Sequence, residues 1–350
     1  MSTIPAESRT HGTSGDKRPI AIIGAGSWGT ALSIVLGGAR HPVRLWARRQ
    51  EVAAAISRTR HNPDYLSEFE LPGSVSATAD PVEAVEGAHI ILLAVPSDGM
   101  RTTCEELALH VGSGQGIISA AKGLEHGSGR RLSEVIGEIL GRRGGPIAVL
   151  SGPNLAPEVA AGIATVSVVA SAEEAFAREV QVSFSTPRFR LYTNPDVLGV
   201  ELGGALKNII AIAAGACDAL GFGDNTKAAL LTRGLTEITR LGVALGARAE
   251  TFRGLSGVGD LVATCASRKS RNHRLGYDLA RGRKLAEILA DMAQVAEGVE
   301  TTRAARRLAE QVGVEMPIMA AVHAVLFEGM SPQEAVTALM TRSWRDELDE

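Results

Sequence analysis

The chain of 350 residues lacks most of the features that mark secreted, metal-binding, membrane-spanning or nucleic-acid-binding proteins. Its 3 cysteines are Cys104, Cys217 and Cys265. An odd number of cysteines without metal-site spacing argues against a disulfide framework or a zinc centre, and for a reducing cytoplasm. Lys and Arg number 36 and Asp and Glu 39, so the charge gives no indication of nucleic acid as a partner. The most apolar stretch, 209–217, is shorter than the roughly 18 residues that a membrane span needs, so we expect no membrane insertion.

The N-terminal 18 residues also have no apolar run. They are rich in Ser, Thr, Gly and charge and lack the hydrophobic segment of a signal peptide, so we expect a disordered extension. The remaining length is sufficient for two domains with cores of their own. The expected bounds are 1–18 for the extension, 19–193 and 194–342 for the two domains, and 343–350 for a tail.

What the sequence does have is a glycine-rich turn directly after its first strand pattern. The run from Pro19 to Leu32 contains the spacing G-x-G-x-x-G at Gly24, Gly26 and Gly29. In a dinucleotide-binding turn the first glycine makes the tight turn and the second admits a pyrophosphate. The third lets the helix pack closely on the sheet. The position at a strand-to-helix junction, where the helix N-terminus favours phosphate, favours cofactor binding over a plain tight turn.

A second strand pattern, 42–49, has a basic end at Arg48 and Arg49, about twenty residues beyond the glycine turn. At this position an Asp or Glu would accept the ribose 2′-hydroxyl of NAD, whereas Arg accommodates the 2′-phosphate of NADP. The first carboxylate after the two arginines is Glu51. The pattern therefore favours NADPH over NADH, and a solvated basic turn is the alternative.

Strands and helices continue to alternate up to about residue 193. We expect a helix over 78–85, with Asp80 as its N-cap and Pro81 in its first turn, and strands over 89–97, 116–121 and 147–150. Because functional loops of such sheets follow the carboxyl ends of the strands, Ser97, Lys122 and the segment 152–154 should lie along one crevice. From Asn194 onward only helical patterns remain. They cover 200–220, 228–245, 272–281, 298–312 and 316–328, with a last helix opened by the capping box that begins at Ser331.

Lys207 lies in the middle of the almost wholly apolar helix 200–220. A buried ammonium is costly unless it is paired, so this lysine needs either a counter-charge or a route to the surface. The natural counter-charge is Asp260, which glycines surround in the run 255–262. We interpret Lys207 as a proton donor that faces the cofactor crevice and Asn208 as a hydrogen-bonding partner of the substrate oxygen. A lysine that reaches the helix surface is the alternative.

The run 267–274 gathers cations with Ser and Asn at the start of a helix, which suits a phosphate monoester. A charge run is more often a solvated face. Its closeness in sequence to Asp260 favours phosphate binding for Arg271 and Asn272.

Taken together, these motifs resemble the bacterial NAD(P)-dependent glycerol-3-phosphate dehydrogenases. The resemblance covers Pro19 to about Arg342 and is carried by G-A-G-S-W-G-T-A-L, A-K-G-L-E, S-G-P-N, Y-T-N-P-D, L-K-N-I-I-A-I-A-A-G, G-F-G-D-N-T-K-A, G-x-G-D-L-x-x-T-C and S-R-N. It implies an α/β protein with an N-terminal Rossmann-type domain and an all-helical C-terminal domain. It also implies the reversible reduction of dihydroxyacetone phosphate to sn-glycerol 3-phosphate with NADPH or NADH, which serves phospholipid synthesis. A cytoplasmic homodimer without metal is expected.

The resemblance also implies roles for individual residues. Lys207 is the expected catalytic acid and base. The expected substrate positions are Lys122, Gly152, Asn154, Lys207, Asn208, Asp260, Ser270, Arg271 and Asn272. The expected cofactor positions are Gly24, Gly26, Ser27, Trp28, Gly29, Arg48, Arg49, Tyr65, Lys122, Ala156, Arg271, Val295 and Glu297. At Tyr65 the sequence departs from the family pattern, since Ser67 stands where the family usually has Pro.

Three other functions fit the residues less well. A 2-hydroxyacid dehydrogenase would use a His base held by a carboxylate, but the 8 histidines fall in turns, the N-terminal extension or apparent helix surfaces without an obvious Asp partner. A nucleotide-sugar dehydrogenase would use a catalytic Cys, and Cys265 is better explained as a small buried hydrophobe. A sensor that binds dinucleotide without turnover would leave Lys207, Asp260 and Arg271 without a purpose.

Overall fold

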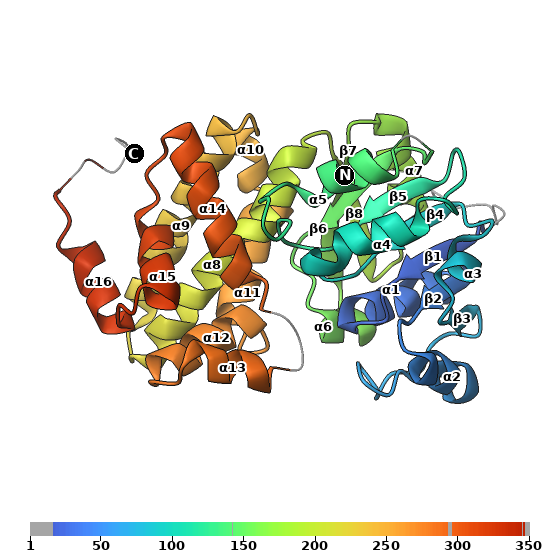
Figure 1. Ribbon diagram of the computed structural model, residues 1–350, viewed down its shortest axis with the longest axis horizontal. Helices are drawn as coiled ribbons and strands as arrows, with labels where there is room; N and C mark the ends of the chain where they lie inside the picture. The colour runs from blue at the N-terminus through green and yellow to red at the C-terminus, as the bar shows by residue number, and fades with distance from the viewer. Residues whose placement is uncertain (1–16, 142, 293–295, 345, 347–350) are drawn as a thin grey trace, which may run out of the picture.

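The computed structural model describes residues 17–141, 143–292, 296–344 and 346. It has a sheet half and a helical half, which lie side by side in Figure 1. The strands are β1 (Ile20–Ile23), β2 (Val43–Trp46), β3 (Val75–Thr78), β4 (Ile90–Leu93), β5 (Gly116–Ser119), β6 (Ile147–Ser151), β7 (Thr165–Ser171) and β8 (Phe189–Asn194). They form one sheet in the order β3-β2-β1-β4-β5-β6-β7-β8.

All neighbouring strands are parallel except β6 and β7, which are antiparallel. Strands β1, β4 and β5 are buried along their whole length, as expected for a sheet covered on both faces. The chain reverses its direction of travel through the sheet at β1, which lies between β2 and β4. In open parallel sheets a ligand binds at such a switch point, outside the carboxyl ends of the strands.

The helices of the sheet half divide between its two faces because successive strand residues point to opposite sides. In β1, Ile20 and Ile22 belong to the cluster packed under α1 (Ser27–Gly38), α2 (Gln50–Thr59), α6 (Ala156–Ala160) and α7 (Glu174–Phe184). Ala21 and Ile23 belong to the cluster under α3 (Pro81–Val85), α4 (Met100–Leu107) and α5 (Leu132–Ile139). A short 3₁₀ turn, η1 (Ser97–Gly99), precedes α4.

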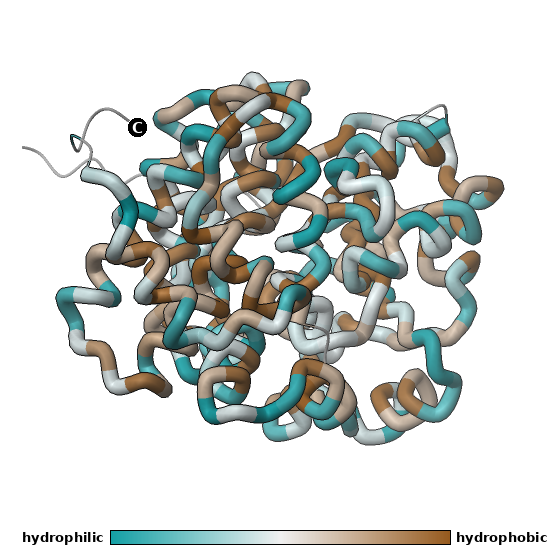
Figure 2. Tube along the Cα trace, turned by 60° about the vertical axis from the view of Figure 1, so that its left-hand side comes forward, coloured by the Kyte–Doolittle hydropathy of each residue, from teal (hydrophilic) through white to brown (hydrophobic). Residues whose placement is uncertain are grey.

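The helical half is built around α8 (Val197–Ala219). The other elements are α9 (Asp224–Ala244), α10 (Ala249–Phe252), the π-helical turn η2 (Leu255–Gly259), α11 (Asp260–Ala266), α12 (Arg271–Ala280), α13 (Leu285–Asp291), α14 (Gly298–Val312), α15 (Pro317–Phe327) and α16 (Pro332–Met340). Helix α8 is long and apolar enough to cross a membrane, but 83% of its apolar window is buried inside the protein. Figure 2 shows hydrophobic and hydrophilic positions alternating along the outer helices, as in amphipathic helices around a core.

The predicted fold class is confirmed, with all elements after Asn194 helical. The domain division at 193/194 remains our proposal. It is supported by the last strand, which ends at Asn194, and by α8, which begins at Val197. Most of the predicted extension, 1–16, lies outside the described residues. Arg18, assigned to that extension, instead forms an ion pair with Glu179 at 3.0 Å.

The start predicted for one helix is wrong. The sequence predicts a helix over 78–85, whereas Thr78 ends strand β3 and the observed helix begins at Pro81. The Asp80 side chain accepts from the backbone N–H of Val82, so the predicted N-cap is correct. The strand was overlooked because its residues Val75–Thr78 are small and only one of them is buried.

Two glycines let α8 and α12 cross at backbone contact. A Cβ atom on Gly276 of α12 would lie 1.8 Å from the carbonyl oxygen of Ile212 in α8, and one on Gly215 would lie 1.8 Å from the carbonyl oxygen of His273. No side chain fits at that distance, so any larger residue would push the two helices apart. The crossing fixes the start of α12, where Arg271 and Asn272 lie.

We expect Gly276→Ala to destabilise the protein by at least about 1–3 kcal/mol, the usual cost of overpacking. The matched control is Gly38→Ala at the end of α1, where an added Cβ has no neighbour within 4 Å. There the better helix propensity of Ala should leave stability unchanged or raise it by about 0.5–1 kcal/mol. Urea unfolding of both variants measures the difference, and a Gly276→Ala midpoint at or above that of the wild type would contradict the close crossing.

Candidate active site

The turn between β1 and α1 has the geometry that its three glycines predict. Gly24 has a φ of +115°, in the region that favours glycine, and a Cβ there would lie 2.8 Å from the Ala94 carbonyl oxygen. A Cβ on Gly29 would lie 1.9 Å from the carbonyl oxygen of Gly24, so only glycine lets α1 approach the strand. At Gly26 an added Cβ would meet no other described residue within 4 Å apart from its chain neighbours, which leaves the backbone open to a ligand.

The first turn of α1 also has a polar atom that fits a bound group. The indole Nε1 of Trp28 is buried and has no hydrogen-bond partner in the part of the chain that the structure describes, and such orphaned donors are rare in folded proteins. Ser27 is the first residue of α1, and Ala156, the first residue of α6, packs against the same core cluster as Trp28. Open backbone, a helix N-terminus and an unpaired donor together fit a dinucleotide phosphate.

Arg48 and Arg49 follow β2 at the next position along this edge of the sheet, and both are exposed. Arg49 forms an ion pair with Asp64, which sequence reasoning missed, and lies 3.7 Å from Glu51. Tyr65, next to Asp64, is half-buried. These residues form a group of their own at the β2 end of the site.

The centre of the candidate site is a pair of lysines, one buried and one partly buried, that share one buried carboxylate. Lys207 Nζ lies 2.8 Å from Oδ1 of Asp260, and Lys122 Nζ lies 2.8 Å from Oδ2. Lys122 also donates to the Gly152 carbonyl oxygen at 2.8 Å and to Oδ1 of Asn154 at 2.5 Å. Lys207 is 5% exposed and Asp260 2%, so Lys207 does not reach the surface and the ion pair is shielded from water.

The fold brings these residues together from four separate segments. Lys122 follows β5, and Gly152 and Asn154 follow β6, at the carboxyl edge of the sheet. Lys207 is on α8 and Asp260 begins α11. Two glycines of α8 permit the approach, since a Cβ on Gly203 would lie 2.7 Å from the Ser256 carbonyl oxygen and one on Gly204 2.7 Å from the Ser151 hydroxyl.

Two members of this network were not singled out from the sequence. Thr264 accepts a hydrogen bond from Lys207 Nζ at 2.5 Å and donates to Asp260 Oδ1 at 3.2 Å. Ser167 accepts from Nδ2 of Asn154 at 3.1 Å, which fixes the orientation of that amide. The spacing of Asp260 and Thr264, four residues apart on a helix, was a usable signal because such residues share one face.

Burial shifts the pKa values of two groups in this cluster. Desolvation lowers the pKa of Lys122 to about 8, an effect that the charge of Lys207 increases and that of Asp260 opposes. Desolvation also raises the pKa of Glu297, although the positive charges of Arg271, Lys207 and Lys122 act against it. Glu297 therefore lies within electrostatic range of all three cations.

The start of α12 forms the other side of the site. The Ser270 hydroxyl caps the helix by accepting from the N–H of His273, which leaves its own hydrogen free for donation. Asn272 accepts from the N–H of Gly298 at 3.0 Å, which ties α12 to the residue after Glu297. Arg271 is exposed and Asn208 is buried beside Lys207. Val295 lies outside the described residues.

Two statements about the rival functions are decided by the structure. The expectation that no histidine has an Asp partner is wrong, since His273 Nε2 lies 2.8 Å from Oδ2 of Asp218. The sequence predicts this ring at a helix surface, but its side chain is only 3% exposed. The interpretation of Cys265 as a buried hydrophobe is confirmed, because it is fully buried and desolvation raises its pKa to about 12.

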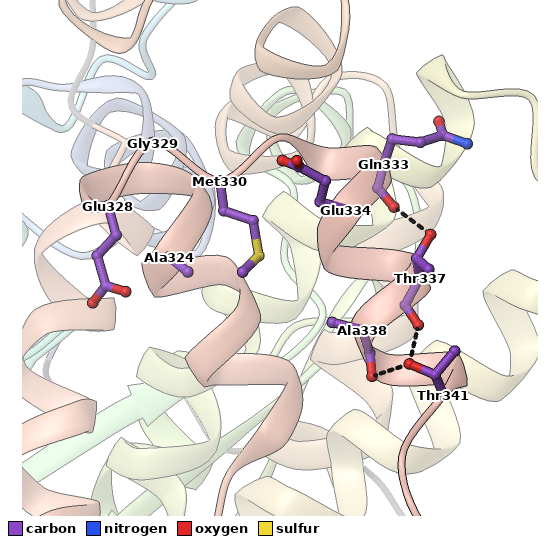
Figure 3. Close-up of a pocket in the computed structure, with 9 residues that line it drawn as sticks. All are labelled: Ala324, Glu328, Gly329, Met330, Gln333, Glu334, Thr337, Ala338 and Thr341. Carbon is purple, nitrogen blue, oxygen red and sulfur yellow. Dashed lines mark hydrogen bonds between the residues drawn. The ribbon is translucent and has the colours of Figure 1, made fainter.

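A hollow of about 600 Å³ lies elsewhere, between α15 and α16 (Figure 3). The hydroxyls of Thr337 and Thr341 on its wall bond to carbonyl oxygens of their own helix. No predicted site residue lines the hollow, so we do not assign the chemistry to it.

The glycine-rich turn, the switch point and the buried lysines define a dinucleotide-binding oxidoreductase with a helical second domain. Comparison with known families makes the class specific. Residues 19–177 match the model of the NAD-dependent glycerol-3-phosphate dehydrogenase N-terminus, and residues 196–337 match that of the C-terminus. The chain belongs to the NAD-dependent glycerol-3-phosphate dehydrogenase family.

Individual relatives agree with this assignment. Glycerol-3-phosphate dehydrogenase (NAD(P)+) 1 of Salinibacter ruber is 50% identical over 94% of this chain and 96% of its own, and the Koribacter versatilis enzyme is 51% identical over 92% and 97%. The crystal structure of glycerol-3-phosphate dehydrogenase from Coxiella burnetii superimposes with a TM-score of 0.89 at 40% identity, over 93% of this chain and 99% of that one. D-mandelate dehydrogenase, with a TM-score of 0.59 at 12% identity, shares the fold alone.

We expect Lys122 to lose its proton near pH 8, whereas an unperturbed lysine would do so at 10.5. The chain has 6 lysines, so the spectrum of protein labelled with ¹³C at the lysine ε-carbon is simple, and Lys122→Arg identifies the signal. Because the group is charged below its pKa, the positive charge that Lys122 offers a ligand decreases as the pH rises through 8. A midpoint at or above the ordinary value would contradict the desolvation of this side chain.

Proposed function

We propose that the protein catalyses the reversible reduction of dihydroxyacetone phosphate to sn-glycerol 3-phosphate with NADPH or NADH. The observation that carries the proposal is the buried Lys207–Asp260–Lys122 group at the carboxyl edge of a dinucleotide-binding sheet. Reduction of a ketone produces an alkoxide, which needs a proton from a positioned acid. A dinucleotide sensor without turnover would not require two desolvated ammonium groups beside one carboxylate.

Lys207 is the proposed acid and base. When bound, the reduced nicotinamide supplies the hydride for the ketone carbon. Lys207 Nζ then gives a proton to the developing alkoxide oxygen and removes one from the hydroxyl in the reverse direction. Asp260 and Thr264 hold this ammonium group in place through contacts of 2.8 and 2.5 Å. Lys122 places a second positive charge near the same oxygen or the phosphate.

The substrate phosphate is proposed to lie at the start of α12. Arg271 would bind it through a bidentate pair, and Ser270 and Asn272 would add neutral hydrogen bonds. The remaining proposed substrate contacts are Lys122, Gly152, Asn154 and Asn208. Binding at the phosphate supplies energy away from the reacting carbon, which fixes the ketone for hydride transfer.

The cofactor residues are proposed on the fit of the β1–α1 turn. The proposed contacts are Gly24, Gly26, Ser27, Trp28, Gly29, Arg48, Arg49, Tyr65, Lys122, Ala156, Arg271, Val295 and Glu297. Arg48 and Arg49 would hold the 2′-phosphate, so we propose that NADPH is preferred and NADH is also used.

We further propose a cytoplasmic homodimer that supplies phospholipid synthesis and neither enters a membrane nor binds nucleic acid. The burial of α8 supports a core role for the apolar helix rather than a membrane span. The near-neutral charge gives no basis for nucleic-acid binding.

The experiment that tests this function follows the loss of reduced nicotinamide absorbance with dihydroxyacetone phosphate. Wild-type protein should turn over both cofactors, NADPH with the higher kcat/KM. Lys207→Ala should lower kcat by about two to four orders of magnitude, the contribution of a positioned acid, and should retain cofactor binding.

The matched control is Lys227→Ala, which removes a lysine paired with Asp218 instead of Asp260. This variant should keep most of the activity. Wild-type protein that binds NADPH but does not reduce dihydroxyacetone phosphate would favour a sensor. A Lys207→Ala variant within about fivefold of wild type would place the acid elsewhere, with Lys122 as the next candidate.

A further inference from the structure

The ion pair between Arg49 and Asp64 lies where the cofactor's ribose phosphate is expected, and we propose that Asp64 tunes the choice between NADPH and NADH. The inference rests on the proposed function, since it needs Arg49 to face the 2′-phosphate. As a counter-ion of Arg49, Asp64 weakens the binding of NADPH, which has the ribose 2′-phosphate, and leaves the binding of NADH almost unchanged.

The loop that contains Asp64 is hydrogen-bonded to the glycine-rich turn between β1 and α1 and to the start of α1. Asn62, which is fully buried, donates from Nδ2 to the carbonyl oxygen of Ala25 at 2.9 Å and to the hydroxyl of Thr30 at 2.8 Å. Its Oδ1 accepts from the backbone N–H groups of Asp64 and Tyr65 at 3.1 and 3.3 Å. The carboxylate is therefore held beside the glycine-rich turn by a buried anchor.

The two arginines differ in their partners. Arg49 forms ion pairs with Asp64 and, at 3.7 Å, with Glu51, whose side chain is 70% exposed, whereas Arg48 is exposed and has no ion pair among the described residues. The side chains of Arg49 and Asp64 are 55% and 33% exposed, and exposed pairs contribute little to fold stability. The pair thus has little structural value, while its position bears directly on any phosphate that approaches Arg49.

The effect on the two cofactors follows from charge. A phosphate monoester has a charge of about −1.5 to −2 at neutral pH, so it must take Arg49 away from Asp64 and remain close to that carboxylate. A ribose hydroxyl is neutral and leaves the ion pair intact. Asp64 therefore penalises NADPH and not NADH, and Arg48, which has no such competitor, supplies the remaining preference.

Equilibrium titration of the full chain with NADPH and NADH, followed by fluorescence quenching, tests the proposal without turnover. Asp64→Asn should lower the Kd for NADPH by about two- to fivefold, a size that exposed ion pairs allow, and change that for NADH by less than about twofold. The gain should decrease at high salt, because exposed charges are screened. It should also disappear in an Arg49→Ala background, since the coupling requires both partners.

The matched control is Glu68→Gln, which removes one negative charge from the same exposed loop without touching Arg49. In this variant the ratio of the Kd for NADPH to the Kd for NADH should stay close to that of the wild type. A weaker Kd for NADPH in Asp64→Asn would show that Asp64 orients Arg49 for the phosphate, and a weaker Kd for NADH would show that it accepts the ribose hydroxyl. Either result, or an unchanged ratio, overturns the proposal. Failure of the wild type to bind either cofactor would instead overturn the proposed function.

Discussion

The candidate site depends on one buried carboxylate. Asp260 contacts the Lys207 ammonium group with one oxygen and that of Lys122 with the other, both at 2.8 Å. Neither lysine would be tolerated at this depth without a counter-charge, and removal of such a partner leaves an uncompensated buried charge. The carboxylate also couples the two halves of the chain, because Lys122 follows a strand of the sheet and Lys207 lies on the central helix.

Backbone packing gives this arrangement its precision. Gly203 and Gly204 let α8 approach the Asp260 loop and the end of β6, and Gly215 and Gly276 let α8 and α12 cross at backbone contact. Helix α8 thus positions both the proposed proton donor, which lies on it, and the proposed phosphate site at the start of α12, which packs against it. Arg271, Lys207 and Lys122 all act on Glu297, as does the carboxylate of Asp98. The site thus places three cations, the groups that a substrate phosphate requires, close to Asp260 and Glu297.

The features of the fold and the site that could be predicted are those that short stretches of sequence determine. The glycine turn follows from spacing at a strand-to-helix junction. The Lys207–Asp260 contact follows from one charge in an apolar helix that needs a partner. The features that could not be predicted depend on tertiary placement. Strand β3 is short and half-exposed, so its pattern does not distinguish it from the turn before α3.

The same limit applies to side-chain partners. His273 and Asp218 are far apart in the sequence and meet only because α8 and α12 cross closely. Asp64 is brought to Arg49 by a loop whose anchor, Asn62, bonds to residues of the first helix and its turn. Thr264 is the exception, because its position one turn after Asp260 could have been used.

The most direct test of the role of the shared carboxylate is the pH dependence of kcat/KM for dihydroxyacetone phosphate in Asp260→Asn. Loss of the negative charge should lower kcat/KM by about a hundredfold or more, because Lys207 loses the partner that positions it as an acid. It should also move the decline at high pH to lower pH, since Asp260 favours the charged form of Lys122. Cofactor titration of the same preparation establishes that the variant is folded. A folded variant with nearly wild-type kcat/KM and an unmoved high-pH limb would contradict the account.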